Sequence, residues 1–153
     1  MPVDFSAGSM RAVQHAAGLA ENFGAAIILL HAVQLNIGGE EVGVPRSHYL
    51  NKLRQTARKR LRRLVHGMER IKIASRIIIG IGRPHLEIVK QAELWRADLI
   101  IMGAHGHIGW LRFLRPNTIA HVVRRATCPV LVVHSGVRGF VTHKSSPSMG
   151  SPG

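Results

Sequence analysis

The stretch "ASRIIIGIGRPHLEIVKQAELWRADLIIMG", residues 74–103, contains the pattern that decides the fold. Two runs rich in isoleucine, Ala74–Ile81 and Ala97–Gly103, flank a segment whose apolar residues recur at helical spacing. Nearly continuous apolar runs are typical of strands covered on both faces, and Pro84 stands where a helix can begin without losing a hydrogen bond. The stretch therefore predicts a strand, a crossover helix and a parallel strand.

The same alternation continues outward in both directions. Apolar runs predict four strands, and helical spacing predicts four helices between or before them, near residues 10–20, 50–65, 86–95 and 119–123. Ser6 or Ser9 can cap the first helix and Gly24 can end it. We therefore expect a doubly wound α/β domain with a parallel sheet. The expected strands are Ala25–Val33, Ala74–Ile81, Ala97–Gly103 and Cys128–His134.

Length and composition favour one compact domain. The chain has 153 residues, of which 46% are hydrophobic, enough to bury a sizeable core. We assign the domain to residues 1–134. Residues 135–153 are too poor in apolar side chains to fold alone and are predicted to form a disordered tail, while residues 38–45 read as a loop.

Cysteine use and hydropathy bear on the compartment. The single cysteine, Cys128, cannot form an internal disulfide, no signal-peptide pattern opens the chain, and the apolar runs are too short to span a bilayer. These features predict a cytoplasmic protein without a transmembrane segment. A formal net charge of +13 favours anionic partners.

A glycine-containing loop follows the strand at Ala97–Gly103. Gly103, Gly106 and Gly109 could turn main-chain N–H groups toward an anion, and a helix beginning near Asn117 would add its positive dipole end. The loop matches neither the GxxxxGK[ST] nor the GxGxxG pattern, so a plain turn and a phosphate site both remain open.

Three stretches together carry a family resemblance: "PVDFSAGSMRAVQHAAGLAENFGAAIILLHAV", "GIGRPHLEIVKQAELWRADLIIMGAHG" and "CPVLVVH". In this order and spacing they resemble the universal stress protein family over Pro2 to about His134. The resemblance implies an open, Rossmann-like five-stranded parallel sheet with helices on both faces, and a homodimer formed through the last strand. Only Met1, Pro2 and Val3 precede Asp4, so we expect a truncated first strand and a native reading frame that begins upstream.

In one branch of that family ATP or another adenine nucleotide, with its Mg²⁺, binds at the strand ends. Pro2 and Asp4 match the adenine end, and Ala32 takes the place of a larger apolar residue there. The family's Gly-x2-Gly-x9-Gly-[Ser/Thr] pattern begins here but lacks its final Gly-Ser, because Pro116 offers no N–H and Asn117 no hydroxyl. The residues that the resemblance assigns to the phosphate end are Met102, Gly103, Ala104, His105, Gly106, His107, Ile108, Pro116, Asn117 and Thr118.

Other polar residues are weaker candidates. Arg112 and Arg115 flank the loop and are either phosphate ligands or solvated basic residues. His105 and His107 have no third metal ligand nearby in sequence, and no nucleophile stands in a GxSxG context. Asp4 could serve as an acid or base, but accepting hydrogen bonds is its simpler use. We therefore expect no dedicated catalysis, and at most slow ATP hydrolysis.

The segment from Val42 to Met68 contains no acidic residue and many basic ones. Such a helix could track phosphates of nucleic acid or of an anionic membrane, or it could present an ordinary solvated face. Two functions follow from the sequence. The first is a stress-response module that binds adenine nucleotide with a degenerate phosphate motif. The alternative is a basic stress protein that binds polyanions or protein partners and no nucleotide.

Overall fold

The computed structural model describes residues 1–34, 46–104 and 118–134, in which helices alternate with parallel strands. The predicted α/β class is confirmed. The loop at 38–45 and the tail at 135–153 lie outside the described residues. The elements are α1 Ala7–Phe23, β1 Ile27–Val33, α2 Arg46–Arg70, β2 Ser75–Ile81, α3 Pro84–Leu94, β3 Ile100–Ala104, α4 Thr118–Arg125 and β4 Val130–His134.

The strands pair in two parts. β1 pairs in parallel with β2, β3 pairs in parallel with β4, and Pro2 forms a single parallel bridge to Leu30 of β1. The Val3 N–H donates to the Leu30 carbonyl at 2.8 Å, and the Leu30 N–H donates to the Met1 carbonyl at 2.9 Å. Met1–Val3 thus run alongside β1 as a short extended segment that forms one bridge to it.

The chemistry of Pro2 explains why the two parts do not merge into one ladder. Met1 and Val3 direct their main-chain groups to β1, so the main chain of Pro2 faces the side away from β1. Proline has no N–H to donate there, and among the described residues no main-chain hydrogen bond joins Met1–Val3 to β3. The two strand pairs are therefore held together mainly by side-chain packing.

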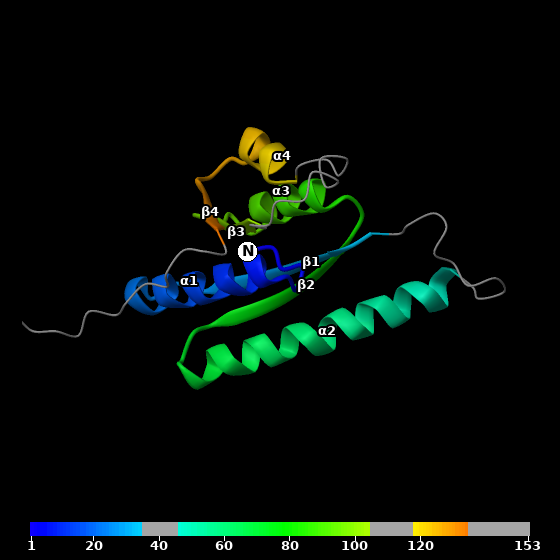
Figure 1. The fold of residues 1–153 in the computed structure, drawn as a ribbon, viewed down its shortest axis with the longest axis horizontal. Coiled ribbons are helices and arrows are strands. Elements are labelled where there is room, and N and C mark those ends of the chain that lie inside the picture. The colour runs from blue at the N-terminus through cyan, green and yellow to red at the C-terminus, as the bar shows by residue number, and fades with distance from the viewer. Residues whose placement is uncertain (35–45, 105–117, 135–153) are drawn as a thin grey trace, which may run out of the picture.

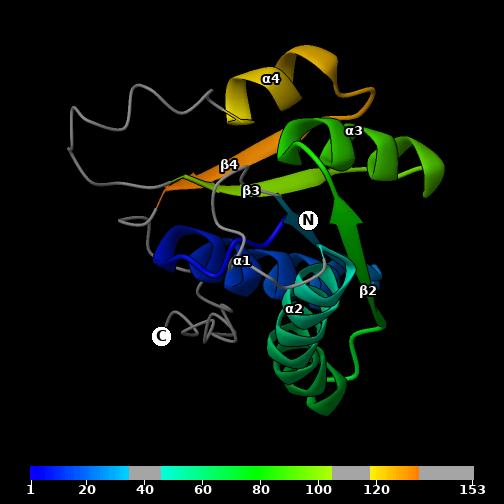
Figure 2. The same cartoon turned by 90° about the vertical axis from the view of Figure 1, so that its right-hand side faces the viewer.

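The helices form two layers around the strands. Figures 1 and 2 show α1 and α2 on one face and α3 and α4 on the other. Successive side chains along each strand point to opposite faces of the sheet, so alternate residues pack against the two helix layers. Leu29 and Ile101 belong to the core cluster that contains α1 and α2, whereas Leu30 and Ile100 pack with residues of α3 and α4.

The predicted ends of α1 and the predicted start of α3 are confirmed. Of the two candidate caps, Ser6 is the N-cap of α1 and its hydroxyl accepts from the Ser9 N–H, while Gly24 ends the helix in the left-handed conformation at φ 63°. Pro84 occupies the first turn of α3. Among the described residues, no helix combines the length and apolar character needed to cross a membrane.

Candidate functional site

The carboxyl ends of three strands meet beside the start of α1. Met1–Val3 run parallel to β1, so Asp4 and Ala32 lie at the same edge. A Cβ on Gly103, near the end of β3, would lie 2.5 Å from the Ser9 nitrogen and closer still to the Gly8 carbonyl, which places the end of β3 against the first turn of α1. The predicted residues Asp4, Ala32 and Gly103 are thus brought to one edge.

Asp4 is exposed and accepts two hydrogen bonds from Ser6. The Ser6 N–H donates at 3.0 Å and the Ser6 hydroxyl at 2.6 Å, both to the same carboxylate oxygen. Ser6 in turn caps α1, so the carboxylate orients the capping residue. This geometry gives Asp4 the acceptor role that its sequence position suggested.

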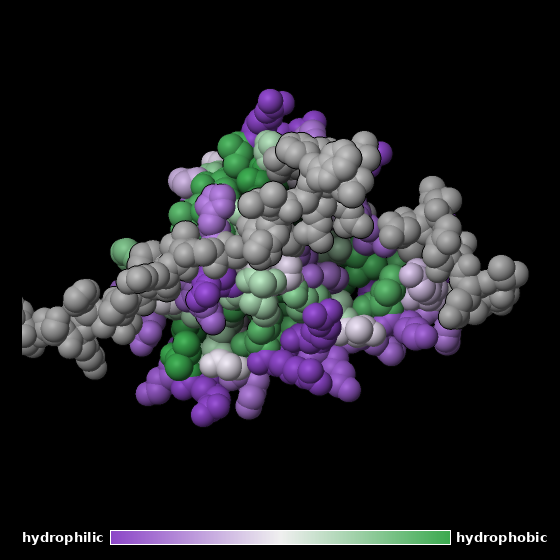
Figure 3. All heavy atoms as spheres, viewed as in Figure 1, coloured by the Kyte–Doolittle hydropathy of each residue, from purple (hydrophilic) through white to green (hydrophobic). Residues whose placement is uncertain are grey.

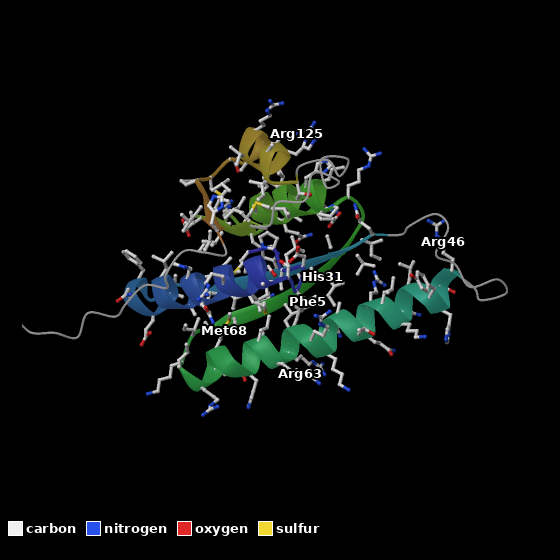
Figure 4. The ribbon with its side chains drawn as sticks, in the orientation of Figure 1. Phe5, His31, Arg46, Arg63, Met68 and Arg125 are labelled. Atoms are coloured by element: carbon white, nitrogen blue, oxygen red, sulfur yellow. The ribbon has the colours of Figure 1, made fainter. Side chains whose placement is uncertain are left out.

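The structure adds a cluster that sequence reasoning missed, formed by Phe5, His31 and Arg60. The His31 ring lies 4.8 Å from the Phe5 ring, and its Nδ1 donates to the Val3 carbonyl at 2.7 Å. The Arg60 guanidinium of α2 lies 3.9 Å above the Phe5 ring centroid. Figure 4 shows Phe5 and His31 together above α2. The cluster adjoins the edge, because Phe5 follows Asp4 and His31 precedes Ala32 in the chain.

Phe5 adopts a left-handed backbone conformation with φ 63°. A non-glycine residue in this region costs roughly 1–2 kcal/mol, and it persists only where neighbouring contacts hold it. Here the ring contacts with His31 and Arg60 and the Asp4–Ser6 hydrogen bonds supply that support. No pattern in the sequence marks such a backbone angle.

The predicted phosphate end is only partly described. Met102 and Ala104 are buried, and Thr118 is the first residue of α4 and is half-buried. Close packing on α1 accounts for the glycine at Gly103, because any side chain there would collide with main-chain atoms. The remaining candidates lie outside the described residues: His105, Gly106, His107, Ile108, Arg112, Arg115, Pro116 and Asn117.

A second candidate surface lies on α2. Lys52, Lys59, Arg63 and Arg70 are exposed and stand on the side of the helix opposite to its buried residues. We call these four residues the basic ridge; it extends for roughly 27 Å along the helix. Figure 3 shows hydrophilic side chains gathered along this edge of the molecule. The outer face of α2 therefore presents a line of positive charge.

Metal chemistry receives no support within the described ranges, where no three His, Cys, Asp or Glu side chains are grouped to hold an ion. Cys128 is a half-buried free thiol just before β4. Its position fits packing.

Comparisons with known proteins place the chain among relatives. The profile of the universal stress protein family matches residues 1–134. Universal stress protein MJ0531 of Methanocaldococcus jannaschii is 33% identical over 140 residues, which cover 87% of this chain and 79% of that protein. The solved structure of MJ0577 from the same organism has a TM-score of 0.74 at 31% identity and covers 87% of this chain and 92% of its own.

A third relative was solved with a nucleotide. The structure of a universal stress protein family member from Arabidopsis thaliana, with AMP bound, has a TM-score of 0.60 at 20% identity, over 86% of this chain and 83% of that one. At this identity the likeness concerns the fold. The family profile and the MJ0531 match together show that the chain belongs to the universal stress protein family.

Proposed function

We propose that this chain binds an adenine nucleotide at the edge where Asp4, Ala32 and the end of β3 meet. The observation that carries the proposal is the convergence of these strand ends beside the first turn of α1. In open parallel sheets, ligands bind outside the carboxyl ends of the strands. The AMP complex of the Arabidopsis relative supports the ligand class.

In this proposal the base end is made by Pro2, Asp4 and Ala32. Ala32 is half-buried and has a small side chain, where the family pattern has a larger apolar residue. The Phe5–His31 pair limits the edge on the β1 side. Polar recognition comes from Asp4, whose carboxylate is exposed at the edge.

The phosphate end of the proposed site should contribute less to nucleotide affinity than the base end. Gly103 is required for packing against α1, so its glycine is no independent sign of phosphate binding. Pro116 and Asn117 replace the glycine and serine of the family pattern. ATP, with its Mg²⁺, should therefore bind only slightly more tightly than AMP. We further propose that the protein works in the cytoplasm during stress and acts through partners rather than through rapid turnover.

Calorimetry with AMP and with ATP plus Mg²⁺ tests this function. We expect both to bind, with dissociation constants within about tenfold of each other, because the base contacts carry most of the affinity. A variant Ala32→Phe, which fills the base end, should abolish both. Failure of both nucleotides to bind at millimolar concentration, or equal binding by Ala32→Phe, would contradict the proposal.

The basic ridge favours polyanion binding as a second function. Its four exposed cations follow one side of a single helix, and no described acidic residue lies within α2 before Glu69. A line of charge suits phosphates repeated along a strand, whose binding declines steeply with salt as counterions are released. Duplex DNA that stays bound at about 0.15 M salt would support this function, whereas release by then would mark the contact as incidental.

A homodimer through β4 is the third proposal. The Ile100 N–H donates to the Pro129 carbonyl, so Leu131 and Val133 face β3 while Val130 and Val132 direct their main-chain groups to the outer edge. An outer edge of this kind can pair with a symmetry mate. Val132→Pro removes one outward donor and leaves the β3 ladder intact. Sedimentation should show the wild type as a dimer and this variant as a monomer; a dimeric variant would point to another surface.

A further inference from the structure

Two histidines from different helices stack against each other where α3 and α4 pack. The ring centroids of His85, in the first turn of α3, and His121, on α4, are 4.7 Å apart with an interplanar angle of 26°. Both side chains are half-buried. The residues come from distant parts of the sequence, and the nucleotide proposal does not use them.

The surroundings of this pair are cationic. Desolvation lowers the pKa of His85, and the nearby His121, Arg125 and Arg83 lower it further. No carboxylate contributes to the balance at His85, and the acidic residue of the first α3 turn, Glu87, lies instead under the main chain of Gly80. Arg83 is the N-cap of α3 and provides no side-chain acceptor to the free N–H groups there. Two histidines and two exposed arginines are therefore neighbours at this junction, and no carboxylate of the described residues is among the groups that influence His85.

We propose that His85, His121, Arg83 and Arg125 bind a phosphoryl group at the junction of α3 and α4. Two neutral imidazoles can stack, but two imidazoliums at this distance repel each other unless an anion neutralises them. Guanidinium groups bind phosphate through paired N–H donors, and the start of α3 adds its positive dipole end. The phosphoryl group can belong to free phosphate or to a nucleotide, since α3 begins at the carboxyl end of β2.

A divalent metal is the competing ligand for two imidazoles. The flanking guanidiniums repel a cation, and no third His, Cys, Asp or Glu joins the pair in the described part of the chain. The anion is therefore favoured. Arg125 belongs to α4, and Figure 4 places it across the molecule from Arg63 of the basic ridge, so the two cationic regions are separate.

The test is a pH titration of the histidine ring protons by NMR, in inorganic phosphate and in sodium chloride of equal ionic strength. Bound phosphate stabilises the imidazoliums, so the pKa values of His85 and His121 should rise by roughly 0.5 to 1. His66, exposed on α2 and 3.6 Å from Glu69, is the internal control and should not change. No change at His85, or an equal change at His66, would overturn the proposal.

Two matched arginine variants distinguish phosphate binding at a specific site from attraction by the overall positive charge. Arg125→Gln should weaken phosphate binding about fivefold to tenfold, whereas Arg124→Gln, its exposed neighbour on α4, should weaken it less than twofold. Equal losses would overturn the proposal, and so would zinc chloride saturating the two rings at lower concentration than phosphate. Repeating the titration with AMP and with ATP shows whether the bound phosphoryl group is free phosphate or part of a nucleotide. Inorganic phosphate contains no adenine, so failure here leaves the nucleotide proposal standing.

Discussion

Helices α1 and α2 cover the same face of the strands but are built differently. α1 buries seven of its 17 residues, most of them small, and approaches β3 closely at Gly103. α2 is longer, with 25 residues, yet buries only Ala57, Leu61 and Met68. A helix with most of its surface in solvent can change its outer residues at little cost in stability. The contrast shows that α1 contributes more buried residues to the core, whereas most of α2 is exposed to solvent.

The largest effect should come from breaking the α1 contact. Gly103→Ala places a Cβ against main-chain atoms of Gly8 and Ser9, which cannot move aside as a side chain can. We expect a loss of about 3 kcal/mol or more in the free energy of unfolding, measured by urea denaturation. Gly67→Ala on α2 is the control, because a Cβ there meets nothing within 4 Å. It should stabilise by about 0.5–1 kcal/mol. Equal effects of the two changes would remove the contrast between the helices.

The next effect tests whether the exposed side of α2 binds polyanions. Reversing Lys52, Lys59 and Arg63 to Glu should weaken DNA binding about a hundredfold and leave the unfolding free energy within about 1 kcal/mol, because all three are exposed. The charge-matched control reverses the exposed residues Lys72, Lys90 and Arg124. Fluorescence anisotropy across a salt series measures both. Equal losses would show that net charge, rather than the ridge, attracts DNA.

A third prediction concerns the phosphate end of the nucleotide site. The double variant Pro116→Gly and Asn117→Ser restores an N–H and a hydroxyl, and ATP affinity should rise roughly tenfold to a hundredfold while AMP affinity stays level. DNA binding through α2 should not change. Calorimetry with both nucleotides checks this. An ATP affinity that does not move would mean that other groups hold the phosphates, with Arg112 and Arg115 the first to examine.

The smallest effect is a pH dependence on the α1 side. The Met1 ammonium donates to the Ile28 carbonyl at 2.8 Å, and burial lowers its pKa from 8.0 to about 6. Between these values the unfolded chain binds more protons, so stability is fully present above pH 8 and is lost as the pH falls toward 6. We expect a change on the order of 2 kcal/mol over this range, because the ammonium group is buried and a pKa difference of one corresponds to about 1.4 kcal/mol.

The control is an N-acetylated protein, which keeps the N–H donor and has no charge to titrate. Its stability should be level over the same range, measured in a His85→Gln background because the lowered pKa of His85 acts in the same direction. A slope that persists after acetylation would assign the pH dependence to another group.

Local patterns in the sequence predicted the elements well and their edges less well. The strand expected from Ala97 begins at Ile100, because the Ala97 N–H still donates to the Ala92 carbonyl and Arg96 turns the chain at φ 46°. Likewise β1 begins at Ile27 because the Ala25 N–H bonds back to Ala20. In both cases the first residues of the apolar run still form main-chain hydrogen bonds to the preceding helix, so the strand begins later. Hydropathy alone does not reveal these bonds.

The site was harder to predict because its contacts join distant residues. The resemblance brought Asp4, Ala32 and Gly103 to one edge, and the structure agrees. The contact of Arg60 with Phe5 and the stacking of His85 on His121 depend on how helices cross strands. A single sequence shows the spacing of residues within one helix or strand, but it does not show which residues of another element they contact.

The seam between the two strand pairs has a consequence for how the molecule opens. Main-chain hydrogen bonds run along β1–β2 and along β3–β4, whereas those of Met1–Val3 in the described part of the chain go to β1. Side-chain packing, rather than a continuous ladder of main-chain hydrogen bonds, therefore holds the two strand pairs together. Both core clusters contain residues of β1 and of β3, so opening the seam exposes apolar surface that the two halves share, and the free energy of that opening comes from burial rather than from main-chain hydrogen bonds.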